Sequence, residues 1–230
     1  MIQITDHLSQ IRASVTQALI RAGRHDQVKL VAVSKQQSAA DIRELFDAGV
    51  RDFGESYAAE ALAKQAELAD LAITWHFIGR IQANKSRSIA SNFSWVHSVD
   101  RVKIAQRLND QRPFDADPLN TLVQVNLAGE SQKGGITEDA VAELAHCIDE
   151  LPRLRYRGLM TIPPAGLQDA DVYALFTRLR GLNETLNQTG LSGDTLSMGM
   201  SRDFEIAIAA GSNCVRIGTA LFGARPKPNP

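Results

Sequence analysis

Residues 28–35 read VKLVAVSK, a short apolar run that ends on a serine and a lysine. Its length and its valines are typical of a strand that is buried on both faces. Such a strand delivers whatever follows it to one end of a sheet. Lys35 is then an amine at the rim of an apolar core, where it loses its proton more easily and can attack a carbonyl. Taken alone, this run is explained better by an ordinary solvated lysine at the end of a strand than by a reactive amine.

The same alternation of a short apolar run and an amphipathic segment repeats along the chain. After an initial helix over about 4–23, the expected strands are 28–35, 50–54, 73–79, 94–97, 120–127, 154–160, 195–198 and 214–217. The expected helices that follow them are 39–48, 57–71, 83–90, 101–110, 138–150, 170–187 and 203–210. Strict alternation implies parallel strands joined by right-handed crossovers. Eight units in 230 residues favour an α/β fold, a closed (β/α)8 TIM barrel over about 28–225, rather than an open doubly wound sheet.

Composition narrows the class of protein further. The apolar fraction of 44%, the charged fraction of 22% and the net charge of −1 are ordinary for a soluble domain and give no reason to expect nucleic acid or a membrane as a partner. Cys147 and Cys214 are far apart, which favours free thiols in a reducing compartment. Neither a secretory signal nor a membrane-spanning segment is recognisable. We therefore expect one cytoplasmic domain that covers residues 1–230.

Two loops near the C-terminus have the chemistry of a phosphate site. In TIM barrels, phosphate commonly binds at the loops after strands seven and eight. After the seventh expected strand, Gly199 allows close approach of the backbone and Ser201 can cap the next helix while offering a hydroxyl. After the eighth, Gly218 and Thr219 can supply another amide and another hydroxyl. Each loop alone is explained by tight turns, but the two together favour an anion site.

Lys35 would lie across the barrel mouth from these loops, and this leaves two interpretations. It could form a Schiff base with a sugar-phosphate substrate, as aldolases do, or hold pyridoxal 5′-phosphate (PLP). Arg216 favours PLP, because it lies two residues before Gly218 in the last strand and so points to the same side. It could face inward and reach a pyridine nitrogen. The alternative is an arginine whose charged end extends to solvent.

Several motifs along the chain resemble those of one family. They are residues 31–35 (VAVSK), 75–79 (WHFIG) with Gln82, Asn84 and Lys85, 158–160 (GLM), 196–201 (LSMGMS), and 215–219 (VRIGT) with 222–223 (FG). They resemble the YggS/PROSC family of PLP homeostasis proteins from about residue 28 to residue 225. Two positions depart from the family pattern: Ser56 replaces an asparagine after FGE, and Arg80 replaces a proline after HFIG.

The resemblance implies a fold-type III PLP barrel like the N-terminal domain of alanine racemase. By motif matching, the cofactor-binding residues would be Lys35 for the Schiff base, the Met200 backbone with Ser201, Gly218 and Thr219 for the phosphate, and Arg216 for the pyridine nitrogen. An arginine there would leave that nitrogen unprotonated and weaken the ring as an electron sink.

The resemblance therefore implies a carrier that takes part in intracellular PLP homeostasis, without robust turnover. Its partners would be PLP and either PLP-dependent apo-enzymes or PLP-synthesising enzymes, and we expect a monomer. A fold-type III enzyme such as an amino-acid racemase is the alternative. Racemisation needs bases on both faces of the substrate, and the β-domain that carries the second base in alanine racemase is not expected here. Tyr57 and His76 are the candidates for such bases near the rim, but a contact at a helix start and a hydrogen-bonded histidine at the barrel end are the favoured interpretations.

Overall fold

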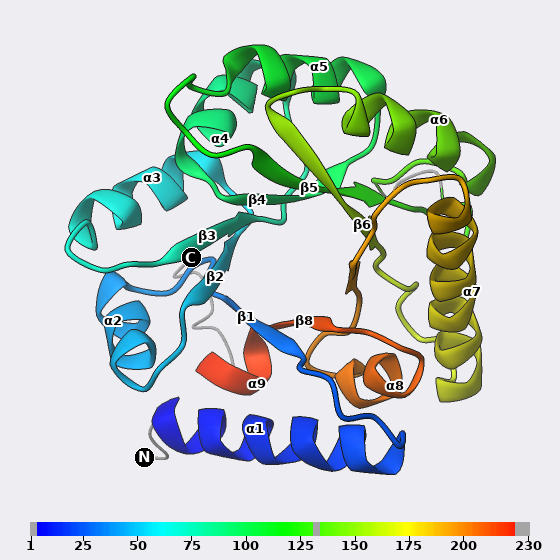
Figure 1. Cartoon of the computed structure of the whole chain (residues 1–230). Coiled ribbons are helices and arrows are strands. Elements are labelled where there is room, and N and C mark those ends of the chain that lie inside the picture. The colour runs from blue at the N-terminus through cyan, green and yellow to red at the C-terminus, as the bar shows by residue number, and fades with distance from the viewer. Residues whose placement is uncertain (1–3, 131–133, 224–230) are drawn as a thin grey trace.

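A closed barrel of parallel strands forms the centre of the computed structural model, which describes residues 4–130 and 134–223. Within these residues, eight strands pair in the order of the sequence, and β8 closes the barrel against β1 (Figure 1). Their bounds are β1 (Lys29–Val33), β2 (Asp52–Glu55), β3 (Thr74–Phe77), β4 (Trp95–Val99), β5 (Leu119–Gln124), β6 (Leu154–Met160), β7 (Thr195–Ser197) and β8 (Cys214–Ile217). The predicted TIM barrel is confirmed.

The first strand shows why this sequence forms a barrel rather than an open sheet. In β1, Val31 and Ala32 are fully buried, and Ala32 lies opposite Phe53 of β2 on one side and Ile217 of β8 on the other. A strand with neighbours on both edges and apolar contacts on both faces cannot lie at the border of a sheet. β1 ends at Val33, two residues before the predicted end, because Gln36 adopts a φ of 62° and the chain turns away from the sheet.

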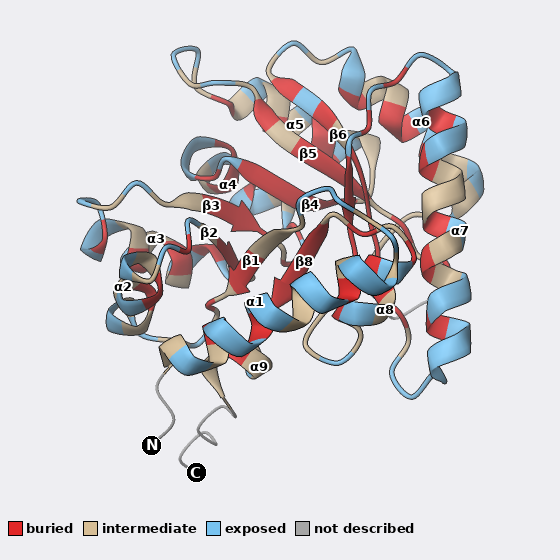
Figure 2. Ribbon diagram, turned by 60° about the horizontal axis from the view of Figure 1, so that its bottom comes forward, coloured by how far each residue is buried: buried red, intermediate tan, exposed pale blue. Residues whose placement is uncertain are grey.

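Helices cover the outside of the barrel. Their bounds are α1 (Ile4–Arg21), α2 (Ala39–Asp47), α3 (Ala58–Glu67), the 3-10 helix η1 (Ala83–Lys85), α4 (Ser86–Asn92), α5 (Val102–Gln111), α6 (Glu138–Asp149), α7 (Asp169–Gln188), α8 (Phe204–Ala209) and α9 (Thr219–Phe222). Figure 2 shows buried strands in the centre and helices whose outer faces are exposed. The main apolar core therefore lies between the strands and this layer of helices.

Two elements bear on the position of the site. The extra N-terminal helix, α1, buries Leu8, Ile11 and Ala18 and packs against α8 and α9, next to the two loops that the sequence marks for phosphate. The short helix α9 was not predicted, since four residues are too few to show a helical period. It starts directly after Gly218 and so orients the last loop. Among the described residues, no helix has the length and apolar character needed to cross a membrane.

Candidate cofactor site

A cavity of about 530 Å³ opens at the end of the barrel where the strands finish. It is lined by residues at or after the ends of β1, β2, β3, β6, β7 and β8. All six residues that the sequence marks as cofactor-binding line it, namely Lys35, Met200, Ser201, Arg216, Gly218 and Thr219. The topology thus brings together positions that are up to 184 residues apart in the chain. Whether they hold a cofactor remains a prediction.

A buried ion pair supports the residue before Lys35. The Ser34 hydroxyl donates to the Glu55 carboxylate (Oγ to Oε1, 2.6 Å), and Ser34 and Glu55 are fully buried. Lys64 of α3 donates to the same carboxylate oxygen at 2.9 Å and to the Ser34 carbonyl at 2.7 Å. Burial raises the pKa of Glu55, even though the bonds from Ser34 and Lys64 lower it. The backbone at Ser34 is therefore fixed by a side chain from a different element.

The residue after Lys35 is fixed by the same group of side chains. Gln36 is the only described residue other than glycine with a positive φ, a conformation that costs free energy for such a residue. Its backbone N–H donates to the Glu60 carboxylate, which also accepts from Lys64 (Nζ to Oε1, 2.6 Å). Bonds on both sides of Lys35 thus hold the turn that presents it to the cavity.

The loop after β7 adopts a conformation that requires glycine. Gly199 has a φ of 95°, and a Cβ atom there would lie 2.6 Å from the Cβ of Ala207 in α8. The Met200 backbone N–H donates to the Asp203 carboxylate at 2.6 Å, so the amide that the sequence assigns to phosphate already has an acceptor. Burial raises the pKa of Asp203, against the effects of the Met200 amide and the Arg216 charge.

Ser201 connects the two predicted phosphate loops. Its hydroxyl accepts the backbone N–H of Ala220, in the first turn of α9, at 3.1 Å. The expectation that Ser201 caps the next helix is wrong, because α8 begins only at Phe204, after Asp203 as its N-cap residue. Gly218 differs from Gly199, since the nearest atom to an added Cβ would be Val33 Cβ at 3.4 Å, an ordinary contact.

Arg216 points into the barrel and not to solvent. Its side chain is buried, with 3% of the residue exposed. Nη1 donates to the Ser197 carbonyl (2.7 Å) and hydroxyl (2.6 Å), and Nη2 donates to the Thr161 carbonyl (3.0 Å). Burial lowers the pKa of Arg216, while Cys214 and Asp203 act in the opposite direction. Described residues accept three of its N–H groups out of the five on a guanidinium, so two are left for a ligand in the cavity.

The candidate second bases do not lie at the site. His76 was the less favoured candidate for a base at the rim, and it is fully buried inside the barrel and does not line the cavity. The stagger between neighbouring strands explains this: His76 lies opposite Trp95, the first residue of β4. Tyr57 is 55% exposed at the start of α3 and is also absent from the lining.

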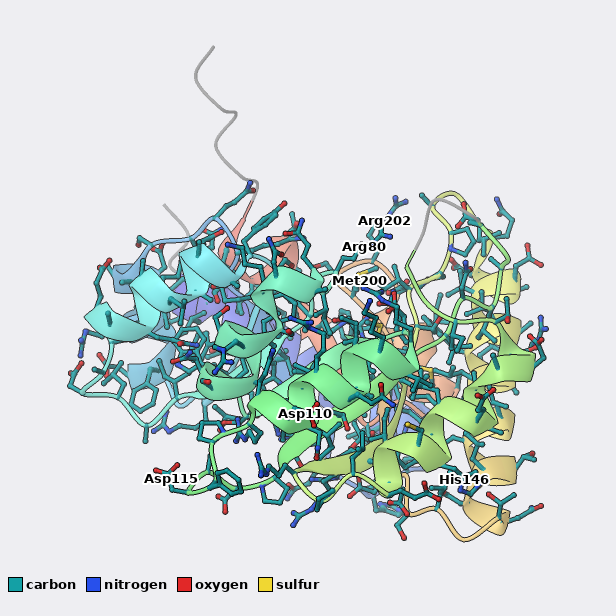
Figure 3. The ribbon with its side chains drawn as sticks, turned by 90° about the horizontal axis from the view of Figure 1, so that it is seen from above. Arg80, Asp110, Asp115, His146, Met200 and Arg202 are labelled. Carbon is teal, nitrogen blue, oxygen red and sulfur yellow. The ribbon has the colours of Figure 1, made fainter. Side chains whose placement is uncertain are left out.

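The two departures from the family pattern have different positions. Ser56 lines the cavity through the loop after β2, so a change there alters the site itself. Arg80 is exposed and does not line the cavity. Figure 3 labels Arg80 with Met200 and Arg202, the latter also an exposed residue, in a view from above.

Sequence reasoning missed the part of the lining that follows β6. Residues 162–167 form a loop that contributes the exposed apolar side chains Ile162 and Leu167 to the cavity. The two prolines at 163–164 predicted a loop but gave no signal for its contact with the site.

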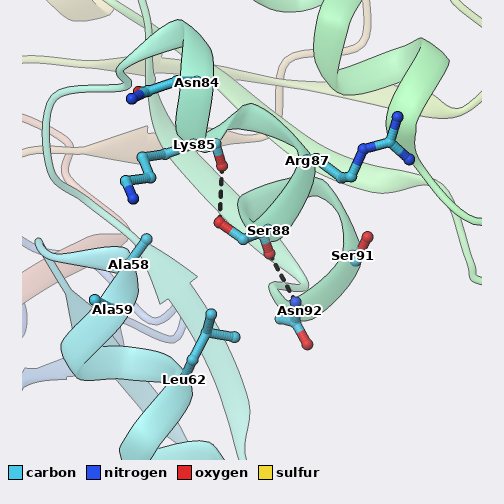
Figure 4. Close-up of a pocket in the computed structure, with 9 residues that line it drawn as sticks. All are labelled: Ala58, Ala59, Leu62, Asn84, Lys85, Arg87, Ser88, Ser91 and Asn92. Carbon is cyan, nitrogen blue, oxygen red and sulfur yellow. Dashed lines mark hydrogen bonds between the residues drawn. The ribbon is translucent and has the colours of Figure 1, made fainter.

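A second cavity, of about 490 Å³, lies between α3 and α4 (Figure 4). Its lining includes Ala58 and Leu62 of α3 and the basic residues Lys85 and Arg87. It shares no residue with the mouth of the barrel among those described. The described residues also contain no cluster of His, Cys, Asp or Glu suited to a metal ion, and Cys147 and Cys214 are free.

Comparison with known proteins places these features in a family. Residues 7–226 match the family model of the alanine racemase N-terminal domain. The chain is 54% identical to the pyridoxal phosphate homeostasis protein of Pseudomonas aeruginosa over 98% of this chain and 97% of that protein. The protein of the same name from Escherichia coli K12 is 46% identical, with 98% of both chains covered.

Solved structures agree in fold. PipY of Synechococcus elongatus PCC7942, solved with PLP bound, is 38% identical and superposes with a TM-score of 0.85, over 96% of this chain and all of PipY. Alanine racemase from Corynebacterium glutamicum, at 17% identity and a TM-score of 0.69, shares the fold over 98% of this chain and 62% of that longer one.

Proposed function

Because the chain belongs to the alanine racemase N-terminal domain family and, within it, to the pyridoxal phosphate homeostasis proteins, we propose that it binds PLP at the barrel mouth. It would hold PLP as a Schiff base on Lys35 and act in PLP homeostasis, by buffering or delivery, without robust turnover. The observation that carries this proposal is the single cavity lined by Lys35, both glycine-hydroxyl loops and Arg216.

The residues at the mouth suit the two ends of PLP. A phosphate needs hydroxyl and amide donors at a loop or helix start, and Ser201, Gly218 and Thr219 supply them where α9 begins. A pyridine nitrogen without a proton is a hydrogen-bond acceptor, and Arg216 keeps N–H groups for it. Bound PLP supplies an electrophilic carbonyl carbon and an electron-withdrawing ring. The Met200 amide can serve the phosphate only if it exchanges its bond to Asp203.

The lining favours a carrier over a racemase. Among the described residues that line the cavity, none is a tyrosine or a histidine, the types best suited to a second base. Asp203, one of its two acidic residues, already accepts the Met200 amide. A guanidinium beside the ring nitrogen also leaves that nitrogen unprotonated. We propose further that the chain works as one cytoplasmic, monomeric domain whose protein partners are apo-enzymes or enzymes that synthesise PLP.

Absorbance of the purified protein tests PLP binding. The wild-type protein should be yellow, or become so when PLP is added, and Lys35→Ala should lose the visible band of the Schiff base. Lys103→Ala is a matched control, since Lys103 is an exposed lysine of α5 and does not line the cavity. A wild-type protein that stays colourless with added PLP would refute the proposal.

Turnover and transfer separate a carrier from an enzyme. The loaded protein is incubated with a panel of L- and D-amino acids, and the chirality of each is followed. A carrier should change none at an enzyme-like rate, and it should activate a PLP-dependent apo-enzyme at a rate different from free PLP at the same concentration. Turnover that Lys35→Ala abolishes would establish the racemase alternative.

A further inference from the structure

A chain of hydrogen bonds crosses the barrel interior and ends on Arg216. We call Asp52, His76, His97, Ser197 and Arg216 the interior chain. Its bonds join Asp52 Oδ1 to His76 Nε2 (2.8 Å), His76 Nδ1 to His97 Nε2 (2.9 Å), His97 Nδ1 to Ser197 Oγ (2.8 Å) and Ser197 Oγ to Arg216 Nη1 (2.6 Å). β4 and β7, which carry His97 and Ser197, are not neighbours in the sheet, so their contact spans the barrel.

Burial isolates the interior chain from water except at its ends. His76, His97 and Ser197 are fully buried, and Trp95 stacks on His76 with ring centroids 5.5 Å apart. The Asp52 side chain is 21% exposed and forms an ion pair with Lys29 at 3.2 Å. Arg216 lines the cofactor cavity at the opposite end. The interior chain therefore connects a partly exposed carboxylate to the candidate site.

The charges at its start determine the direction of the first bonds. Burial alone would raise the pKa of Asp52, but the bond and charge of His76, together with Lys29, lower it, so Asp52 is a carboxylate at neutral pH. Burial lowers the pKa of His76 despite the opposing effect of Asp52. A neutral His76 beside a carboxylate must donate from Nε2, and its Nδ1 must then accept.

The same reasoning extends from His76 to Arg216. Burial, reinforced by the charges of its neighbours, lowers the pKa of His97 well below its usual value, so His97 is neutral too. Its Nε2–H donates to His76, and its Nδ1 accepts the hydroxyl proton of Ser197. Ser197 Oγ is then free to accept from Arg216. Every bond is donated in one direction, from the guanidinium toward Asp52.

We propose that Asp52, His76, His97 and Ser197 are positioning residues for Arg216, which they hold with an N–H group turned to the cofactor. The proposal rests on the proposed function for the identity of the ligand. Without an acceptor at His97 Nδ1, the Ser197 hydroxyl has to turn its proton elsewhere, and Arg216 loses a well-oriented partner. A change at Asp52, remote from the cavity lining, then reaches the cofactor through the tautomers of two histidines.

The tautomers can be tested without any ligand. In protein labelled with ¹⁵N-histidine at pH 7, both His76 and His97 should be neutral and carry the proton on Nε2. Asp52→Leu removes the acceptor of the His76 Nε2 proton and leaves the Lys29 ammonium as a donor near that nitrogen, so the protons of both rings should move to Nδ1. A wild-type spectrum with His97 protonated on Nδ1, or with either ring charged, would overturn the interior chain as described.

The effect on the cofactor site is tested by titration with PLP. His97→Leu should weaken PLP binding by about tenfold or more, the size expected when a hydrogen bond to a charged group is disturbed, and shift the visible absorption maximum. His97→Asn should recover most of the PLP affinity and most of the wild-type absorption maximum, since its side-chain oxygen can accept from Ser197 where Nδ1 did. A folded His97→Leu with the wild-type affinity and spectrum, or a folded His97→Asn no better than His97→Leu, would refute the positioning role.

Asp52→Leu provides the same test should His97→Leu fail to fold, because Asp52 is partly exposed. It should shift the absorption maximum of bound PLP although residue 52 does not line the cavity. An unshifted maximum would refute the coupling. If the wild-type protein itself fails to bind PLP, the proposed function is at fault, and the NMR test still decides the interior chain.

Discussion

Lys64 shows how one residue can matter to a site that it does not line. Its side chain is 8% exposed, and its ammonium contacts two carboxylates, of which Glu55 is fully buried. Lys64→Met removes the cation and leaves the buried carboxylate with Ser34 alone. We expect the free energy of unfolding at pH 7 to fall by about 3 kcal/mol, measured by urea denaturation.

The control for that variant is the double change Lys64→Met with Glu55→Gln. With both charges gone, no unpaired ion is left in the protein, and part of the lost stability should return. The raised pKa of Glu55 allows a second test, which compares the loss of stability in Lys64→Met at two pH values. A carboxyl group with a raised pKa favours the folded state at low pH, so Lys64→Met should lose less stability near pH 4.5 than at pH 7. An equal loss at both pH values would contradict the charge argument.

Single residues were predictable from sequence where a strand end fixed their place. Lys35 and Arg216 were placed at the mouth by counting along strands, and both line the cavity. Lys64 was not, because a lysine inside an expected helix looks like any solvated lysine. For His76 the sequence favoured a hydrogen-bonded histidine at the barrel end over a base at the rim, and the structure gives it two hydrogen bonds inside the barrel.

The loops after β7 and β8 contain glycines with different roles, and matched variants separate them. Gly199→Ala places a methyl group 2.6 Å from Ala207 Cβ at a φ of 95°, so we expect a loss of about 1–3 kcal/mol in unfolding free energy. Gly218→Ala meets only an ordinary contact and should change the stability of the PLP-free protein by less than about 0.5 kcal/mol.

PLP affinity completes that comparison. If the phosphate lies against the Gly218 backbone, Gly218→Ala should weaken PLP binding even though the protein is as stable as wild type. Calorimetric titration with PLP gives the dissociation constant for both variants. A Gly218→Ala protein that binds PLP as tightly as wild type would remove this loop from the proposed phosphate site.

At the level of elements, the eight strands followed from the alternation of apolar runs and amphipathic segments. Each lies within a few residues of its predicted range; β2, for example, is Asp52–Glu55 against 50–54. The helix α9 could not be predicted, because tertiary contact with α1 and a bond from Ala220 to Ser201 stabilise a segment too short to form alone. This helix is nevertheless the element that sets the last loop of the site.

At the scale of the whole molecule, polar groups occupy part of the barrel interior. A barrel of this size is usually filled by apolar side chains, and burying histidine and arginine costs free energy unless each hydrogen bond is made. The interior chain satisfies His76, His97 and Ser197 from within the barrel. Sequence alone could not reveal it, since its members lie on five strands and no spacing links them.

This polar interior predicts how the stability of the whole protein depends on pH. The pKa of His97 is well below its usual value in the folded state, so below about pH 6.5 the unfolded chain binds a proton that the folded protein does not. Stability must therefore fall as the pH drops. For His97 the loss is about 1 kcal/mol between pH 6.5 and 5.5, and His76 adds to it in the same direction.

The measurement is urea denaturation of the PLP-free protein at both pH values, for wild type and His97→Asn. Asparagine does not titrate, so the loss between pH 6.5 and 5.5 should be smaller in the variant by about 1 kcal/mol, whatever the absolute stability of each protein. Contributions from Asp52 and Glu55 are common to the two proteins and cancel in the difference. Equal losses would mean that His97 is charged in the folded protein. Its Nδ1 would then donate to Ser197 Oγ instead of accepting from it, while Arg216 would still donate to the same oxygen.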